Sequence, residues 1–322
     1  MRTERALHRL ALALVLATVG LIFAGGLVTS TESGLSVPDW PTTYGQNPFT
    51  FPVSKWVGGI KFEHSHRLIA SAVGLLTVVV AVAFARGEKR AWVRRLAYLA
   101  LAAVVAQGVL GGLTVLFLLP TAISVAHACL AQTFFCLAVA LAVVTSPRWR
   151  EAEPAGANSV RRMAAATVAV VFLQLLVGAV MRHTKAGLAI PDFPLAFGRV
   201  VPPITSFAVA IHFAHRMTAL AVAAAAAVCL VRARRSGRED LKRIACALGG
   251  LVGVQIALGA LTVLSKKDVI LTTAHVVTGA LVLGASLVLA LASRRTSMSA
   301  SRKTASRTPA AAISLSEEPA WK

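Results

Sequence analysis

The sequence QGVLGGLTVL, residues 107–116, returns as QIALGALTVL at residues 255–264. Seven of the ten positions are identical, and the two copies lie 148 residues apart. Each copy is part of an apolar run long enough to cross a bilayer as a helix, which takes about 20 residues. A membrane-spanning segment that occurs twice predicts a fold built from two related halves.

Further matched segments extend the repeat along the chain. They are EHSHR (63–67) with HFAHR (212–216), GLSVPDWP (34–41) with GLAIPDFP (187–194), and His127 with His275. The offset stays between 148 and 153 residues, so the chain is an internal duplication.

The composition is that of a membrane protein. Of the 322 residues, 57% are hydrophobic and 14% are charged, and the mean hydropathy is +0.72, far from the average of soluble domains. We expect the first span to be retained rather than cleaved as a signal peptide, because its apolar run is long and it has a counterpart later in the chain. The eight predicted spans are roughly Leu10–Val28, Leu68–Ala85, Leu96–Leu119, Thr121–Ser146, Met163–Met181, Phe207–Val231, Ile244–Ser265 and Val269–Ser293.

The net charge of +20 would suggest nucleic-acid binding in a soluble protein. Here 24 of the 33 Lys and Arg residues lie at the N-terminus, in alternate connections and in the C-terminal tail. This is the asymmetry of the positive-inside rule, and it predicts that both termini are cytoplasmic. Because topology accounts for the basic residues, we expect no nucleic-acid partner.

Each half supplies four spans, so the halves should have the same orientation. We predict an all-α membrane protein of two duplicated four-helix bundles, related by a pseudo-twofold axis along the membrane normal. The first bundle covers residues 1–150 and the second 151–295, and residues 296–322 are predicted to be a disordered cytoplasmic tail. The longest connections, 29–62 and 182–206, should lie outside as ordered caps over the bundle mouths.

Four histidines, two in each half, are predicted to lie at similar depth near the outer face. His66, His127, His215 and His275 each occur near the outer end of an even-numbered span. Ionisable residues inside spans are costly and point to function. Two opposed imidazoles in a four-helix bundle are typical of a haem site with axial nitrogen ligands. The alternative for each is an interhelical hydrogen bond; zinc is disfavoured because each pair lacks further ligands, and copper stays open.

Two arginines and two glutamines recur with the repeat. Arg67 and Arg216 directly follow the second-span histidine of each half, where a guanidinium could pair with haem propionates. The alternative is snorkelling to lipid head groups. Gln107 and Gln255 suit interhelical hydrogen bonds and substrate contacts equally well.

The two halves differ at one informative position. Glu63 stands three residues before His66, on the same helix face and about one turn nearer the surface. The residue three before His215 is His212 instead. This difference predicts that only the first half does chemistry, with Glu63 taking or giving a proton or stabilising a cationic intermediate. The alternative is a solvated acid near the helix N-terminus. His64 should point elsewhere and contact only the outer loop.

Jointly these features resemble the haem A synthase family, membrane enzymes that oxidise the C8 methyl group of haem O to the formyl group of haem A. The resemblance covers about residues 8–293. It is carried by the eight spans, the two halves, the sequence TESGLSVPDWP (31–41), the Glu-x-x-His-Arg of the second span and single histidines in the fourth, sixth and eighth. It implies an oxidoreductase that works by successive hydroxylation.

The resemblance also implies roles for individual residues. His215 and His275 would hold haem b as cofactor with Arg216 nearby, His66, His127 and Arg67 would bind the substrate haem O, and Glu63 matches the catalytic acid. The expected location is the bacterial plasma membrane. Candidate partners are the haem O synthase, a membrane or soluble electron-transfer protein and a second copy of the chain. The first outer loop lacks the cysteine pair of many bacterial members, so no redox role is expected of it.

Two other classes of protein compete with this interpretation. A cytochrome b561-like bis-haem electron carrier explains the four histidines equally well. It does not explain why only one half has Glu63, and it predicts haems at both membrane faces. A transporter fits the duplicated bundles but gives no reason for matched histidines.

Overall fold

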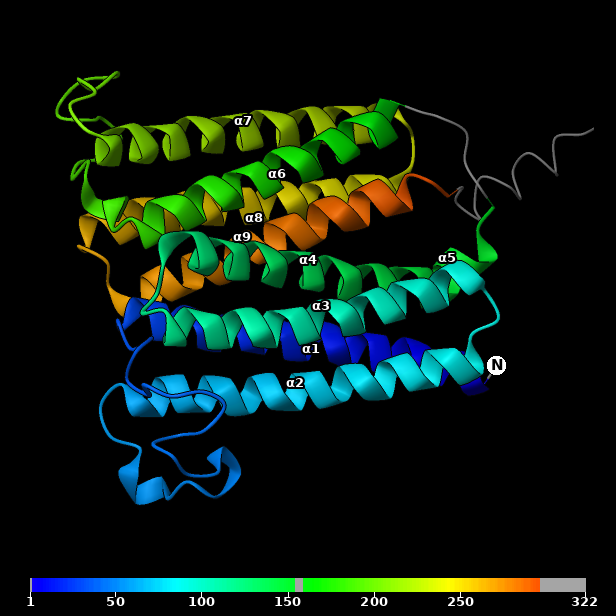
Figure 1. Ribbon diagram of the computed structural model, residues 1–322. Coiled ribbons are helices and arrows are strands. Elements are labelled where there is room, and N and C mark those ends of the chain that lie inside the picture. The colour runs from blue at the N-terminus through cyan, green and yellow to red at the C-terminus, as the bar shows by residue number, and fades with distance from the viewer. Residues whose placement is uncertain (1, 154–158, 296–322) are drawn as a thin grey trace, which may run out of the picture.

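The computed structural model describes residues 2–153 and 159–295. Within these residues the chain is almost entirely helical, and two isolated β-bridges lie in loops. The α-helices are α1 (Arg2–Ser30), α2 (Ile60–Gly87), α3 (Ala91–Leu116), α4 (Thr121–Thr145), α5 (Pro147–Glu151), α6 (Ser159–His183), α7 (Phe207–Arg235), α8 (Glu239–Leu264) and α9 (Val269–Ala292) (Figure 1). All but α5 are long and apolar enough to span a membrane.

The predicted eight-span, all-α membrane protein is therefore confirmed, and the short α5 is an element that the sequence did not predict. The predicted disordered tail lies outside the described residues. Most spans extend a few residues beyond the predicted bounds. Helix α2 begins eight residues before its predicted start, at Ile60, so the cluster from Glu63 to Arg67 lies inside the helix.

Side-chain caps fix where two helices with candidate histidines begin. The Asp268 carboxylate accepts hydrogen bonds from the backbone N–H groups of Ile270 and Leu271, both at 3.0 Å, and so starts α9. The Ser206 hydroxyl accepts one from Val209 N–H at 3.3 Å and starts α7. Such caps satisfy the N–H groups that the first helical turn leaves unpaired.

The helices pack as two groups of four. In α1–α4 each helix packs against the next and α1 closes against α4, and α6–α9 pack in the same cyclic order. Between the groups, α1 contacts α9, α4 contacts α6 and α4 contacts α9. Exchanging the two groups turns the α1–α9 contact into the α6–α4 contact, which is the pattern that a twofold relation requires.

The centre of the molecule lies where the two groups meet. Half of the apolar window of α4 and of α9 is buried, against a third or less in the other six spans. Phe135 of α4 packs there with Ile22 of α1 and Ala280 of α9. Large apolar side chains on the outward faces of the helices, such as Leu16 of α1 and Leu75 of α2, are exposed, as expected of surfaces that face lipid.

Two loops fold back over the same end of the bundle, on the left in Figure 1. They cover residues 31–59 and 184–206. In each loop an aspartate, Asp39 or Asp192, accepts two backbone N–H hydrogen bonds of 2.7 to 2.9 Å. Burial alone would raise the pKa of Asp39, but hydrogen bonds from Gly45 N–H and the Thr42 hydroxyl lower it overall. The loops are therefore folded structures, as predicted for caps.

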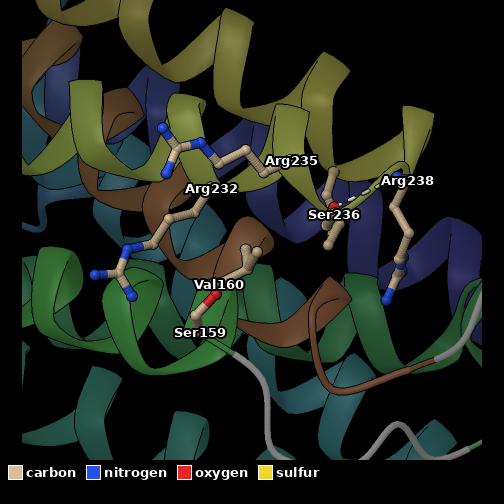
Figure 2. Close-up of a pocket in the computed structure, with 7 residues that line it drawn as sticks. Ser159, Val160, Arg232, Arg235, Ser236 and Arg238 are labelled. Atoms are coloured by element: carbon tan, nitrogen blue, oxygen red, sulfur yellow. Dashed lines mark hydrogen bonds between the residues drawn. The ribbon is translucent and has the colours of Figure 1, made fainter.

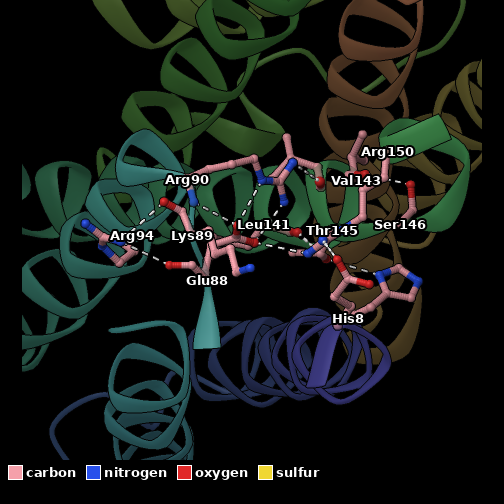
Figure 3. A network of polar contacts seen from close by, with 12 residues as sticks. His8, Glu88, Lys89, Arg90, Arg94, Leu141, Val143, Thr145, Ser146 and Arg150 are labelled. Carbon is pink, nitrogen blue, oxygen red and sulfur yellow. Dashed lines mark hydrogen bonds and ion pairs between the residues drawn. The ribbon is translucent and has the colours of Figure 1, made fainter. Parts of the chain in front are cut away.

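A polar network closes the opposite end of the first group (Figure 3). The Glu88 carboxylate accepts hydrogen bonds from Arg90 at 2.8 and 3.0 Å and from Arg150 at 3.1 Å. Arg90 also donates to the carbonyl of Val144 at 3.0 Å, and Arg150 pairs with Glu4. Hydrogen bonds from Arg90, with the charges of Arg90 and Arg150, lower the pKa of Glu88 to about 2. The network ties the α2–α3 turn to α1, α4 and α5.

Candidate functional site

The four predicted histidines all lie near the ends of helices that start beneath the loops. His66, His127 and His275 are each the seventh residue of their helix, and His215 is the ninth. At 1.5 Å per residue, this is about 9 to 12 Å along the helix axis. In the second half the rings of His215 and His275 lie close together, and His66 and His127 occupy the corresponding positions of the first half.

The rings of the second-half pair are separated by about the distance that two ligands of one ion require. The ring centroids of His215 and His275 are 6.4 Å apart, and the ring planes meet at 66°. A metal–imidazole bond is about 2 Å long and the ring centroid lies about 1 Å further on, so two rings on opposite sides of one ion have centroids about 6 Å apart. The separation of the two rings would therefore allow His215 and His275 to hold one ion between them.

A glycine on a neighbouring helix makes room for each of the four rings. A Cβ atom added to these glycines would lie only 2.9 to 3.1 Å from the Cε1 atom of the facing imidazole, a distance at which one of them must shift. The pairs are Gly25 with His66, Gly111 with His127, Gly178 with His215 and Gly259 with His275. Gly25 and Gly178 therefore correspond, at the same offset of 153 residues as the loop segments. Residue counting alone did not predict this pattern.

Glutamine side chains contact three of the imidazoles. The Gln107 amide lies 3.3 Å from His127 Nε2, and the Gln255 amide lies 3.3 Å from His275 Nε2. Gln174, which the sequence analysis missed, donates to the His215 carbonyl at 3.0 Å and lies 3.2 Å from Nδ1. The interhelical role of the two predicted glutamines is thus present.

Each half offers two imidazole donors, which favours a metal ion whose remaining ligands come from a bound cofactor. The described residues contain no group of three or more His, Cys, Asp or Glu side chains able to hold a metal. In the first half, the buried Nδ1 atoms of His66 and His127 have no hydrogen-bond partner among the described residues. Unpartnered buried nitrogens call for an explanation, and a haem, whose porphyrin supplies the equatorial ligands, suits sites with two imidazoles.

Glu63 is buried at the mouth of the first half and is tied to the loop above it. One carboxylate oxygen accepts a hydrogen bond from Val37 N–H at 2.8 Å, and the other pairs with Arg67 at 2.7 Å. Arg67 also donates to the carbonyls of Val37, Asp39 and Thr42 at 2.7 to 3.1 Å. Because its carboxylate is buried and paired, Glu63 is not the solvated helix-mouth acid that was the alternative interpretation.

The second half repeats the anchor with another side chain. His212 Nδ1 accepts a hydrogen bond from Ile190 N–H at 3.2 Å, the counterpart of the Val37 contact. Arg216 donates to the carbonyls of Ile190, Asp192 and Leu195 at 2.6 to 3.2 Å. Both arginines therefore hold their loops. Their predicted pairing with haem propionates stays a prediction.

The first loop carries aromatic residues that cover the α2 and α3 ends. His64 is fully buried against Phe51 and Trp56 and lies 3.2 Å from the Thr43 hydroxyl, so it contacts the loop as expected. A Cβ atom added to Gly112 would meet the indole of Trp40 at 2.4 Å, so the loop also rests on α3.

A hollow lies at the other end of the molecule from the histidines. It has a volume of about 500 Å³ and is formed where α6, α7 and α8 approach one another (Figure 2). Its lining is Ser159, Val160, Arg232, Arg235, Ser236, Arg238 and Leu241. No imidazole or carboxylate lines it, so it belongs to the basic end and not to the candidate site.

Fold and site together define a duplicated eight-span membrane protein that presents a pair of imidazoles in each half beneath a folded loop. The chain belongs to the cytochrome oxidase assembly protein family, COX15-CtaA, whose family model matches residues 8–287. This confirms the resemblance suggested by the sequence.

Three relatives of this chain carry the name heme A synthase. The heme A synthase of Symbiobacterium thermophilum is 30% identical over 84% of this chain and 90% of its own length. The heme A synthase of Halalkalibacterium halodurans is 28% identical over 81% of this chain and 89% of its own. That of Sphingopyxis alaskensis is 30% identical over 86% and 88%. The similarity thus covers nearly all of the helical region, so haem is the ligand class that the family indicates.

Proposed function

We propose that this protein is a haem A synthase, which oxidises the C8 methyl group of haem O to a formyl group. The two imidazole pairs support a haem in each half. The relatives' common name supports this substrate and product. The observation that carries the assignment of chemistry is the buried carboxylate of Glu63 at the mouth of one pair, where the other pair has His212.

In this proposal the two halves have different tasks. Residues 1–150 form the substrate half, where His66 and His127 hold haem O. Residues 151–295 form the cofactor half, where His215 and His275 hold haem b. The matched glycines leave room for the rings of all four histidines, which supports a ligand site of the same kind in each half. The cytochrome b561-like carrier, in which both haems are permanent, would have no use for a carboxylate at only one of them.

The residues of the first half then act on the methyl group in a defined way. Haem b, when bound, supplies the redox chemistry. His66 and His127 orient the substrate macrocycle, and the folded loop limits access of water. Glu63 holds or moves a proton at Oε1 or Oε2 during successive hydroxylation to an alcohol and to a hydrated aldehyde that loses water. Arg67 and Val37 N–H stabilise its carboxylate form and fix its position.

The same proposal gives the protein its place in the cell. The folded loops face outward and the basic end, with Glu88, Arg90 and Arg150, faces the cytoplasm of a bacterial plasma membrane, following the charge asymmetry. Both termini are then cytoplasmic. The haem O synthase and an electron-transfer protein stay candidate partners on chemical grounds, since one supplies the substrate and the other exchanges electrons.

The test is pigment extraction from membranes of cells that make haem O, with and without this protein, resolved by chromatography. Glu63→Gln keeps an acceptor for Val37 N–H but removes the charge, and His212→Gln is the matched control in the other half. We expect haem A with the native chain and with His212→Gln. With Glu63→Gln we expect the amount of haem A to fall at least about 100-fold, while bound haem b is retained.

Two results would count against the proposal. Haem b bound by the native chain with haem O left unchanged, despite a working electron supply, would favour the bis-haem electron carrier. Equal loss of haem A in Glu63→Gln and His212→Gln would assign Glu63 to anchoring the loop alone.

A further inference from the structure

One guanidinium lies between the two halves, and neither the repeat nor the mechanism above uses it. Arg182 is in the last turn of α6, four residues after Gly178, the glycine that makes room for the His215 ring. Residues four apart lie on one face of a helix, about 6 Å apart along its axis. Arg182 is therefore about one turn nearer the loops than Gly178, on the α6 face that carries this glycine.

The contacts of Arg182 place it beside both halves. Its Nη2 donates to Ser30 Oγ at 2.9 Å and to the Gly26 carbonyl at 3.2 Å, both on α1. The Thr273 hydroxyl of α9 donates to the same Ser30 oxygen at 3.1 Å. A Cβ atom added to Gly26 would lie 3.1 Å from the side chain of Thr273, two residues before His275. Arg182 thus lies where α1, α6 and α9 meet, next to the second-half pair.

Most of the hydrogen-bonding capacity of Arg182 is unused. A guanidinium has five N–H donors, and the three on Nε and Nη1 have no acceptor among the described residues. No described carboxylate lies within ion-pair distance of Arg182 either. A cation in a membrane domain without a counter-ion is costly and marks a functional position.

Arg182 differs from Arg216, the other arginine near the second-half pair, in having a terminal nitrogen, Nη1, that donates to no described residue. Arg216 already donates to three loop carbonyls from both terminal nitrogens. The residue that corresponds to Arg182 in the first half is Thr29, so only the second half has this cation. The acidic groups of a haem are its propionates, which lie at one edge of the macrocycle and favour the polar end of the site.

We propose that Arg182 binds a propionate carboxylate of the haem held between His215 and His275. This inference rests on the proposed haem site of the second half. Charge-assisted hydrogen bonds from Nη1 and Nε hold the carboxylate, while Nη2 keeps α6 against α1. Arg182 is a cofactor-binding residue in this account and takes no part in the proton transfer of Glu63.

The test compares haem b with its dimethyl ester, in which both propionates are uncharged. The full chain is made in haem-limited cells, purified in detergent and titrated with each compound, following the absorbance of the bis-imidazole complex. The variants are Arg182→Gln and Arg182→Lys, and the matched control is Ser30→Ala, which removes an acceptor of Arg182 but keeps the guanidinium.

We expect the native chain and Ser30→Ala to bind haem b about 10- to 100-fold more tightly than the diester. Arg182→Gln should bind the two compounds about equally, and Arg182→Lys should keep part of the preference. The midpoint potential of bound haem b should fall in Arg182→Gln, because loss of a nearby positive charge favours the ferric state, and should not change in Ser30→Ala.

An unchanged preference for haem b in Arg182→Gln, with an unchanged potential, would overturn the proposal and leave Arg182 as a brace between α6 and α1. Failure of the native chain to form a bis-imidazole complex at His215 and His275 would instead overturn the proposed cofactor site, and the role of Arg182 with it. The two failures are distinct, because the first occurs in a chain that binds haem b.

Discussion

Glu63 and His212 occupy the same position in the two halves, and each accepts a hydrogen bond from a backbone N–H group of its own loop. One nitrogen of an imidazole is enough for this anchor. The carboxylate supplies a second oxygen, and in the first half that oxygen pairs with Arg67. The position therefore has a structural task in both halves, and the first half has a charged group in addition.

Removing one histidine from each pair should separate the two sites. His275→Ala should abolish the haem b spectrum of the purified protein, because one axial ligand is lost. His127→Ala should keep that spectrum but form no haem A in membranes that contain haem O. Absorbance spectra of the purified variants and pigment chromatography measure the two effects. Equal loss of haem b in both variants would contradict the division into a cofactor half and a substrate half.

The glycine beside His215 should be intolerant of a single methyl group. In Gly178→Ala the new Cβ would lie 2.9 Å from Cε1 of the ring, so the imidazole must move. Overpacking of this kind costs about 1 to 3 kcal/mol, so we expect haem b affinity to fall about 10-fold or more in a titration.

Gly253 provides the control for this substitution. A Cβ atom there meets nothing within 4 Å, and alanine is the better helix former by about 1 kcal/mol. Gly253→Ala should therefore bind haem b as the native chain does. The packing explanation fails if both variants lose haem b to the same extent.

Replacing Arg67 by lysine should loosen the first loop although the charge is kept. A single ammonium group cannot reach the three loop carbonyls and Glu63 together. We expect residues 31–59 to be cleaved about 10-fold faster by an added protease, with less haem A formed. Arg216→Lys should loosen only residues 184–206. Unchanged cleavage of both loops would show that other contacts hold them.

The Glu88 network should make stability depend on pH. Since its pKa falls from 4.5 to about 2 on folding, Glu88 stabilises the folded state above pH 4.5, and this stabilisation disappears as the pH falls toward 2. Glu88→Gln should therefore reduce the free energy of unfolding at pH 7 by at most about 3 kcal/mol. The unfolding temperature should fall accordingly. The difference from the native chain should shrink below pH 4.5.

Glu239→Gln is the matched control, because Glu239 forms an exposed pair with Lys242. Exposed pairs contribute little to stability, so its effect should be small at every pH. Thermal unfolding in detergent measures both variants. A Glu88→Gln effect that is the same at pH 3 and pH 7 would contradict the assignment.

The residues that could be predicted from the sequence are those that recur at a constant offset. The apolar runs gave the eight spans, and the repeat gave the four histidines and Glu63 with its exchange for His212. The partners of Arg67 could not be predicted, because the Val37 carbonyl lies 30 residues away and is brought close only by the folded loop. Gln174 and Arg182 were missed because their first-half counterparts are Leu21 and Thr29, so no repeat drew attention to them.

Gly25 and Gly26 of α1 stand next to each other but face different halves. Gly25 faces His66 in its own half, whereas Gly26 faces Thr273 of α9. One turn of α1 thus packs against residues of both halves. In an ancestor with only one four-helix unit, the same contact would join two copies as a symmetric dimer. In this chain the two copies of the contact differ, because Gly26 is matched by Ala179. Two identical subunits could not differ in this way, so the joined chain permits an asymmetry between the halves that a homodimer would lack.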